Sequence, residues 1–141
     1  MFPFLYILMD EYFSRLLYQE ILMGNIPGMV MSKGSKEANH LQFANDTLLM
    51  GGSSSIYIAI QFKYVINVYT NAYGGSENKG KGCLCGWNIS DTHVQNLDKL
   101  LWFSYETSWH SFKYLGIPLL IGNENSSDWN GILDKFIKNL T

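Results

Sequence analysis

The segment from His40 to Met50, His-Leu-Gln-Phe-Ala-Asn-Asp-Thr-Leu-Leu-Met, constrains the fold more than any other part of this chain. Two short, mainly apolar runs flank a small, polar centre, which is the pattern of a tight β-hairpin whose strands pack on a core. Asn45 and Asp46 suit the tip, because both residue types tolerate unusual backbone angles and can bond to nearby main chain. The segment therefore predicts two antiparallel strands joined by a polar turn that can carry chemistry.

Length and composition favour one folded domain around this hairpin. The chain has 141 residues, of which 47% are apolar and 15% aromatic, which is enough to fill a core and argues against disorder. The formal net charge is −2. A free-standing nucleic-acid binder normally presents a basic face that releases counterions from the phosphates, so the charge argues against that class of protein.

Four segments have the residue pattern of helices. Apolar residues recur in them at steps of three and four, and serines before and glycines after several of them supply caps. The second segment is rich in β-branched residues, which makes a strand its rival, but its length favours a helix. The helices are expected over Pro3–Met23, Ile56–Tyr73, Thr92–Trp102 and Trp129–Leu140.

Short extended segments separate these helices. Pro27-Gly28 marks a turn, and the polar stretch Ser32–Asn39 predicts a loop flanked by a pair of strands. Cys83–Trp87 has the pattern of a strand, and Phe112–Leu119 that of a single strand closed by a proline. Asn123–Ser127 has the composition of a linker. Helices alternating with short strands in this way predict an α+β fold.

Gly75, Gly80 and Lys81 match the glycine and lysine frame of a phosphate-binding loop. The next residue should be Ser or Thr, which binds magnesium, and it is Gly82. The motif also needs a strand before it and a helix after it, whereas the pattern here predicts the reverse. A nucleotide-binding domain built on this loop is therefore not expected.

The apolar N-terminus, Met1–Met9, has no basic leader and runs directly into Asp10-Glu11 without a small-residue cleavage site. It is also too short to span a bilayer. An intracellular protein without a membrane partner, in the cytoplasm or the nucleus, is the resulting expectation.

The hairpin segment also resembles a known motif. Phe43-Ala44-Asn45-Asp46 is similar to the Phe-Ala-Asp-Asp motif of reverse transcriptases, in the form found in the non-LTR (LINE-type) retrotransposons of plants. One letter differs, because Asn45 stands where the family has the first aspartate of the pair.

Three further landmarks of this family occur in the family's order and extend the resemblance over nearly the whole chain. Pro3–Leu8 resembles the end of the motif B helix, and Gly74, Asn78 and Lys81 fall in register with a Ser-Gly-x-x-x-Asn-x-x-Lys-Ser segment. Phe112–Pro118 matches Phe-x-Tyr-Leu-Gly-(Ile/Leu)-Pro, which in the family lies where palm meets thumb and the primer is gripped. Each match is weak alone, and the ordered set is specific.

The resemblance implies a partial reverse-transcriptase palm, an antiparallel sheet with packed helices, over residues 1–120, and a linker with the first thumb helix over 121–141. The family copies an RNA template onto a DNA primer with Mg²⁺. The slightly negative net charge of this chain does not conflict with the family's function. Much of the contact with phosphates can come from parts of the polymerase that this sequence does not match.

Carried over residue by residue, the resemblance assigns Asp46 as the remaining catalytic and metal-binding carboxylate, Asn45 as the altered metal ligand and Lys81 as a contact to nucleotide phosphates. Magnesium prefers anionic oxygen ligands, and the family uses an aspartate on an upstream strand together with the first aspartate of the hairpin. The sequence contains no match to that upstream strand, and Asn45 offers a neutral amide. Asp10 or Glu11 as replacement ligands are disfavoured, because they belong to a helix that packs. The chain alone is therefore predicted to be inactive.

A second hypothesis is a small non-enzymatic domain, derived from the palm, that binds a protein or a nucleic acid. The hairpin should pair with the upstream strand in the family, so its open edge would be left for other partners or for self-association. The sequence therefore predicts a marginally stable monomer that tends to aggregate.

Overall fold

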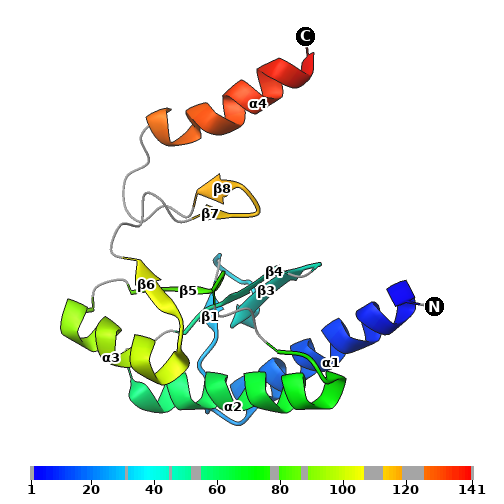
Figure 1. Cartoon of the computed structure of the whole chain (residues 1–141), viewed down its shortest axis with the longest axis vertical. Helices are drawn as coiled ribbons and strands as arrows, with labels where there is room; N and C mark the ends of the chain where they lie inside the picture. The colour runs from blue at the N-terminus through cyan, green and yellow to red at the C-terminus, as the bar shows by residue number, and fades with distance from the viewer. Residues whose placement is uncertain are drawn as a thin grey trace.

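The computed structural model describes residues 2–30, 32–44, 46–51, 55–76, 80–86, 89–106, 113–118 and 126–140. Three helices, α1 (Phe2–Leu22), α2 (Ile56–Tyr73) and α3 (Asp91–Leu101), form one layer, and short strands lie along one side of it (Figure 1). A fourth helix, α4 (Asn130–Leu140), follows a 3₁₀ turn at Ser126–Trp129 and stands apart from this layer. The described part of the chain is therefore an α+β fold, as the sequence predicts.

All four helix predictions are confirmed to within one or two residues, and local caps explain why. The Ser55 side chain accepts a hydrogen bond from the Tyr57 backbone N–H at the start of α2. Gly74 ends that helix in the left-handed conformation, with φ of 71°, which glycine adopts at little cost. Ser90 caps α3 by accepting from the His93 N–H. These caps favour helix over strand between Ser55 and Gly74.

The predicted hairpin and the predicted strand pair before it are both present. In each of them the two strands are antiparallel. The strands of the first pair are β1 (Met29–Val30) and β2 (Glu37–Ala38), and those of the hairpin are β3 (His40–Phe43) and β4 (Asp46–Leu49).

The predicted strand at Cys83 is present as β5 (Cys83–Cys85), but its partner was missed by the sequence reasoning. It pairs in parallel with β6 (Ser104–Glu106), so the two strands and the intervening α3 form a β-α-β unit. A parallel pair needs such a crossover. The prediction of an antiparallel sheet is thus wrong for this pair, and the strands form two-stranded units within the described residues.

The prediction of one strand over Phe112–Leu119 is also wrong. The described residues of this segment form a second tight hairpin, in which β7 (Lys113–Tyr114) pairs with β8 (Ile117–Pro118). Leu115 and Gly116 join them with positive φ angles of 53° and 78°, as mirror-image two-residue turns require. Phe112 and Leu119 lie outside the described residues.

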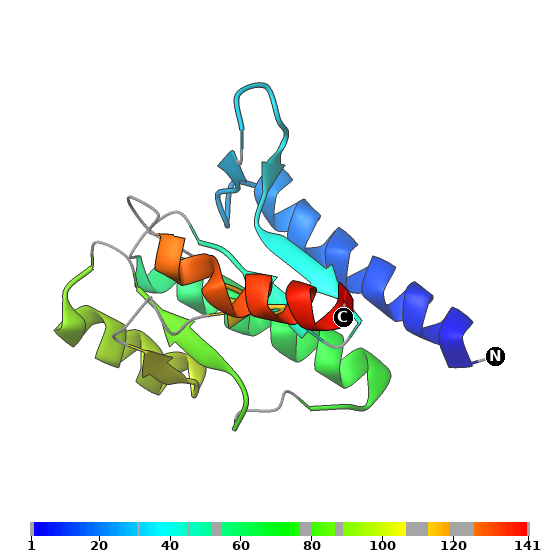
Figure 2. The same ribbon diagram turned by 90° about the horizontal axis from the view of Figure 1, so that it is seen from above.

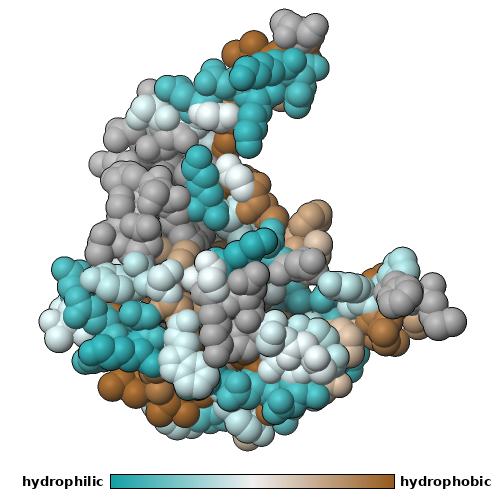
Figure 3. Space-filling model, viewed as in Figure 1, coloured by the Kyte–Doolittle hydropathy of each residue, from teal (hydrophilic) through white to brown (hydrophobic). Residues whose placement is uncertain are grey.

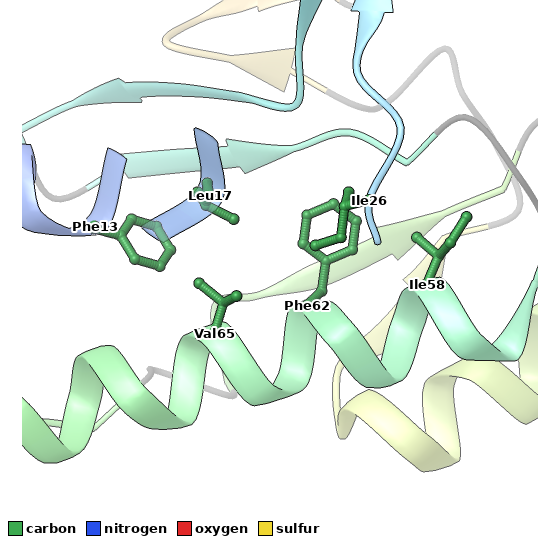
Figure 4. Close-up of a cluster of buried hydrophobic side chains, with 6 residues drawn as sticks. All are labelled: Phe13, Leu17, Ile26, Ile58, Phe62 and Val65. Atoms are coloured by element: carbon green, nitrogen blue, oxygen red, sulfur yellow. The ribbon is translucent and has the colours of Figure 1, made fainter. Parts of the chain in front are cut away.

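The main core lies between α1 and α2 and is closed by the chain that follows α1. Its side chains point toward one another from both helices, as Figure 4 shows. Leu49 of β4 packs against the same cluster, so the hairpin rests on this core through one face. The core consists of Phe13, Leu17, Ile26, Ile58, Phe62 and Val65.

Two helical segments remain largely outside this core. The N-terminal half of α1 projects beyond the body of the molecule (Figure 2). Apolar side chains there, including Phe4 and Ile7, are exposed. None of the residues of α4 is buried. Figure 3 shows a wide gap between α4 and the helix layer, with apolar surface on parts of α4. The packed part of the structure is therefore centred on α1, α2 and the hairpin.

Candidate functional site

The register of the central hairpin determines which of its side chains face the helices. His40 pairs with Leu49, Leu41 with Leu48, Gln42 with Thr47 and Phe43 with Asp46. Because side chains alternate along a strand and paired residues share a face, the hairpin has two distinct surfaces. The inner face consists of His40, Gln42, Thr47 and Leu49, and the outer face of Leu41, Phe43, Asp46 and Leu48.

This arrangement corrects two details of the sequence prediction. Phe43 pairs with Asp46, so Asp46 opens β4 instead of standing at the tip. Ala44 follows β3 with a φ of 49°, a left-handed angle that short hairpin loops demand. The expectation that the apolar residues of β3 pack on the core is also wrong, since Leu41 and Phe43 are exposed. Asn45 lies outside the described residues.

Polar side chains on the inner face bind the hairpin to α1. His40 Nε2 lies 3.0 Å from Ser14 Oγ, and Gln42 Nε2 donates a hydrogen bond of 3.0 Å to Asp10 Oδ1. Ser14 Oγ also lies 3.3 Å from Gln42 Oε1. The start of β3 is therefore attached to the middle of α1 by polar side chains as well as by the core. These side chains, together with Asn39, are called the polar ladder: Asp10, Ser14, Asn39, His40 and Gln42.

Asn39, immediately before β3, is the most buried member of this ladder, with 0% of its surface exposed. Its Nδ2 donates to the Leu17 backbone oxygen over 2.9 Å, and its Oδ1 lies 2.8 Å from His40 Nδ1. Its backbone oxygen accepts from the Met50 N–H. Asn39 therefore joins the start of β3, the end of β4 and α1 at one point.

A surface hollow of about 420 Å³ adjoins this ladder. Its walls come from one side of α1 and from the start of β3. On α1, Arg15 Nε and Glu11 Oε1 form an ion pair, 2.7 Å apart. Burial lowers the pKa of His40 below its ordinary value of 6.5. The hollow is lined by Glu11, Ser14, Arg15, Tyr18 and His40.

Asp46 belongs to the outer face and is exposed. Asp10 is bonded to Gln42 on the inner face, so the hairpin lies between these two carboxylates. In the part of the chain that the structure describes, no group of three His, Cys, Asp or Glu side chains is placed to hold a metal ion. On the outer face of the hairpin, Asp46 is the one carboxylate among the described residues.

The second hairpin reaches the outer face at Asp46. The Tyr114 hydroxyl donates a hydrogen bond of 3.2 Å to the Asp46 backbone oxygen. Partial burial raises the pKa of Tyr114, and the nearby Asp46 carboxylate raises it further. Two segments that the resemblance singles out, 68 residues apart in sequence, are thus in contact.

Lys81 is exposed in the turn before β5. It forms no ion pair with Asp46 among the described side chains. A helix precedes this segment and a strand follows it, which is the reverse of a phosphate-binding loop. Asn78, its expected companion, lies outside the described residues.

Apolar periodicity in the sequence does not predict the polar ladder of Asp10, Ser14, Asn39, His40 and Gln42. One signal was present, namely the alternation of polar His40 and Gln42 with apolar Leu41 and Phe43. Strict alternation indicates a strand with two unlike faces, but it does not say which face meets the helix.

No helix within the described ranges is both long enough and apolar enough to cross a membrane. Comparison of the chain with protein-family models, with curated proteins and with solved structures finds no match.

Proposed function

We propose that this chain is a part of the palm of an RNA-directed DNA polymerase of the non-LTR retrotransposon kind, followed by the start of a thumb, and that it does not polymerise DNA by itself. The observation that carries the proposal is the contact between Tyr114 and Asp46. It brings the Tyr-Leu-Gly-Ile-Pro segment against the Phe-Ala-Asn-Asp hairpin, as expected if the first segment holds a primer end beside the second.

The arrangement of helices supports the same proposal. The hairpin rests on α1, the helix that resembles the end of motif B, and α2 packs beneath both of them. α4 follows the second hairpin in the chain, which is the order that the resemblance implies for a first thumb helix. The order of landmarks in the sequence and their arrangement around one hairpin therefore agree with a palm.

Inactivity follows from the charge at the hairpin. Asp46 is the carboxylate of the outer face, while Asp10 lies behind the hairpin and Asn45 carries a neutral amide. Replacing one unit charge beside a divalent cation removes attraction on the order of 8 kcal/mol at 4 Å for a near-surface site, twice the value for two unit charges. An RNA template, a DNA primer and Mg²⁺ are the family's partners. We expect that this chain does not use them alone, because Asp46 is the one carboxylate that the resemblance assigns to the metal. Lys81 is proposed only as a phosphate contact.

A chimaera tests the ancestry. Residues 1–120 carrying Asn45→Asp would replace the matching segment of an active LINE-type reverse transcriptase, and primer extension on an RNA template would be measured with Mg²⁺. We expect extension from this chimaera and a loss of at least about 100-fold when Asn45 is retained, since the bridging carboxylate is then missing. Asp46→Ala in the same chimaera is the matched inactive control.

One result with the chimaera would contradict the proposed ancestry. A chimaera with Asn45→Asp that is monodisperse and binds the primer–template, yet extends no primer, would contradict the proposal. The 141-residue chain should give no incorporation above buffer with Mg²⁺ or Mn²⁺. Tyr114→Phe should reduce extension by the active chimaera because it releases the second hairpin from Asp46.

The outer face favours a second candidate function, a non-enzymatic interaction domain. Phe43 is 65% exposed there and Leu41 is 39% exposed. Exposed apolar side chains beside an unpaired sheet edge commonly mark contacts with another chain. Fluorescence anisotropy with a labelled RNA–DNA hybrid separates the two partner classes, because the acidic chain should bind it weakly unless the face recognises nucleic acid.

A further inference from the structure

Three side chains of the inner ladder form a relay from a hydroxyl through an imidazole to an amide. Ser14 lies on α1, and His40 and Asn39 lie at the start of β3. The two links are short, 3.0 Å between Ser14 Oγ and His40 Nε2 and 2.8 Å between His40 Nδ1 and Asn39 Oδ1. This is the order of groups found where a serine acts as a nucleophile: hydroxyl, base and a group that orients the base.

The buried amide determines where the protons lie. Asn39 Nδ2 donates to the Leu17 backbone oxygen, so the other end of the amide, Oδ1, faces His40. An amide oxygen can only accept, so His40 Nδ1 must carry the hydrogen of that bond. The Nε2 lone pair then faces Ser14 and can accept its hydroxyl proton. The competing acceptor, Gln42 Oε1, is farther from Ser14 Oγ, at 3.3 Å.

The protonation state of the imidazole agrees with this role. Burial lowers the pKa of His40, so the ring is neutral at pH 7 and available as a base. The charged groups that face it across the hollow are Glu11 and Arg15, and Tyr18 is the other titratable group there. Asp10 is separated from it by Gln42.

The hollow beside the relay provides room for a small substrate. It has a volume of about 420 Å³, and Ser14 and His40 both line it. Arg15 follows Ser14 in sequence and bonds Glu11 through Nε, so its terminal guanidinium nitrogens are not used in that bond. A positive group that lines the same hollow can stabilise an oxyanion, and Tyr18 is the aromatic residue of the lining.

We propose that Ser14, His40 and Asn39 form a nucleophilic site that hydrolyses small carboxylic esters. Ser14 Oγ forms a bond to the ester carbonyl carbon while its proton moves to His40 Nε2. The bond to the leaving alkoxide or phenoxide then breaks, and that oxygen takes the proton from His40. Water, deprotonated by His40, next attacks the acyl-serine, and the proton returns to Ser14 Oγ as the carboxylic acid leaves. Asn39 acts as a positioning residue.

Hydrolysis of p-nitrophenyl acetate by the full chain tests the proposal, with detection of acetyl-Ser14 by mass spectrometry after acid quench. General-base assistance typically supplies about 10²–10⁴-fold, so Ser14→Ala should lower the rate by about 100-fold or more. His40→Gln should do the same, and Arg15→Gln should lower kcat more than it changes KM. Ser76→Ala, a serine substitution outside the site, should leave the rate unchanged.

The pH profile and a folding control distinguish a catalytic role of Ser14 and His40 from a structural one. The rate should rise with pH through the lowered pKa of His40 and level off near pH 7, and the circular dichroism of Ser14→Ala should match that of the parent. A rate that persists in a folded Ser14→Ala variant would overturn the proposal, as would acetylation confined to other residues. The outcome is independent of whether the chain descends from a polymerase.

Discussion

Two helices of this protein, α2 and α4, both carry apolar side chains but have opposite surroundings. α2 buries Ile58, Ala59, Phe62 and Val65 against α1 and the chain around it, whereas the corresponding apolar side chains of α4 remain exposed. Local pattern specifies a helix in both cases. Whether an apolar face is buried depends on a partner elsewhere in the chain, and in the described residues only α2 has one.

The central hairpin repeats this contrast across a single β-ladder. Its inner face is bonded to α1 and contacts the core, and its outer face exposes Leu41 and Phe43. Stability should therefore depend on the core and the inner face, and association should depend on the outer face and α4.

The largest effect is expected in the core. Leu17 is 0% exposed, and Leu17→Ala should lower the free energy of unfolding by about 2–5 kcal/mol, the usual cost of a leucine-sized cavity. Leu133→Ala in α4, where the side chain is 53% exposed, is the matched control and should change it by no more than about 0.5 kcal/mol. Urea denaturation followed by circular dichroism measures both.

Equal losses in these two variants would mean that α4 is packed as tightly as the core between α1 and α2, and the contrast between packed and exposed helices would then fail. A large loss for Leu17→Ala alone would sharpen it.

The next effect is expected at the junction before β3. Asn39→Ala removes a fully buried amide and leaves His40 Nδ1–H without its acceptor. The expected loss in free energy of unfolding is about 1–3 kcal/mol, the cost of an unsatisfied buried polar group. Asn96→Ala on the exposed side of α3 is the control and should be neutral. A neutral Asn39→Ala would show that the polar ladder does not hold the hairpin.

A smaller effect on the free energy of unfolding is expected from protonation of His40, because protonation removes no packed side chain. Its folded-state pKa lies below the unfolded value of 6.5. Between these two pKa values the unfolded chain binds more protons, so stability rises with pH across that window and is highest above pH 6.5. Urea denaturation at pH 5.5 and 7.5 should show the difference. His40→Gln should flatten it, and an unchanged slope in that variant would assign it to other groups.

The helices of this fold are predictable from sequence because their signals are local. Ser55, Gly74 and Ser90 cap α2 and α3 where the sequence places those residues. Each cap acts within one turn of its helix, so no knowledge of distant residues is needed.

The strands and the site were harder to predict, for a physical reason. β6 forms a strand because β5 lies beside it. Leu115-Gly116 forms a turn with a positive φ at leucine, which the sequence pattern does not predict. The alternation at His40–Phe43 predicts two faces but not which one meets α1. The contact of Tyr114 with Asp46 spans 68 residues, and only the assembled fold creates it. The role of Asn45 as the altered metal ligand and the domain boundary at residue 120 stay predictions.

The smallest effect on folding is expected on the outer face, where Phe43→Lys tests association. The side chain is exposed, so the free energy of unfolding should change by no more than about 0.5 kcal/mol. A lysine on an open sheet hinders strand-to-strand pairing, because its charge would have to be desolvated. Sedimentation velocity should show self-association of the parent chain that increases with concentration and that Phe43→Lys reduces. Asn96→Lys adds the same charge to α3 and should leave association unchanged. If Phe43→Lys instead destabilises the fold by several kcal/mol, the outer face belongs to the core, and the difference between the two faces of the hairpin disappears.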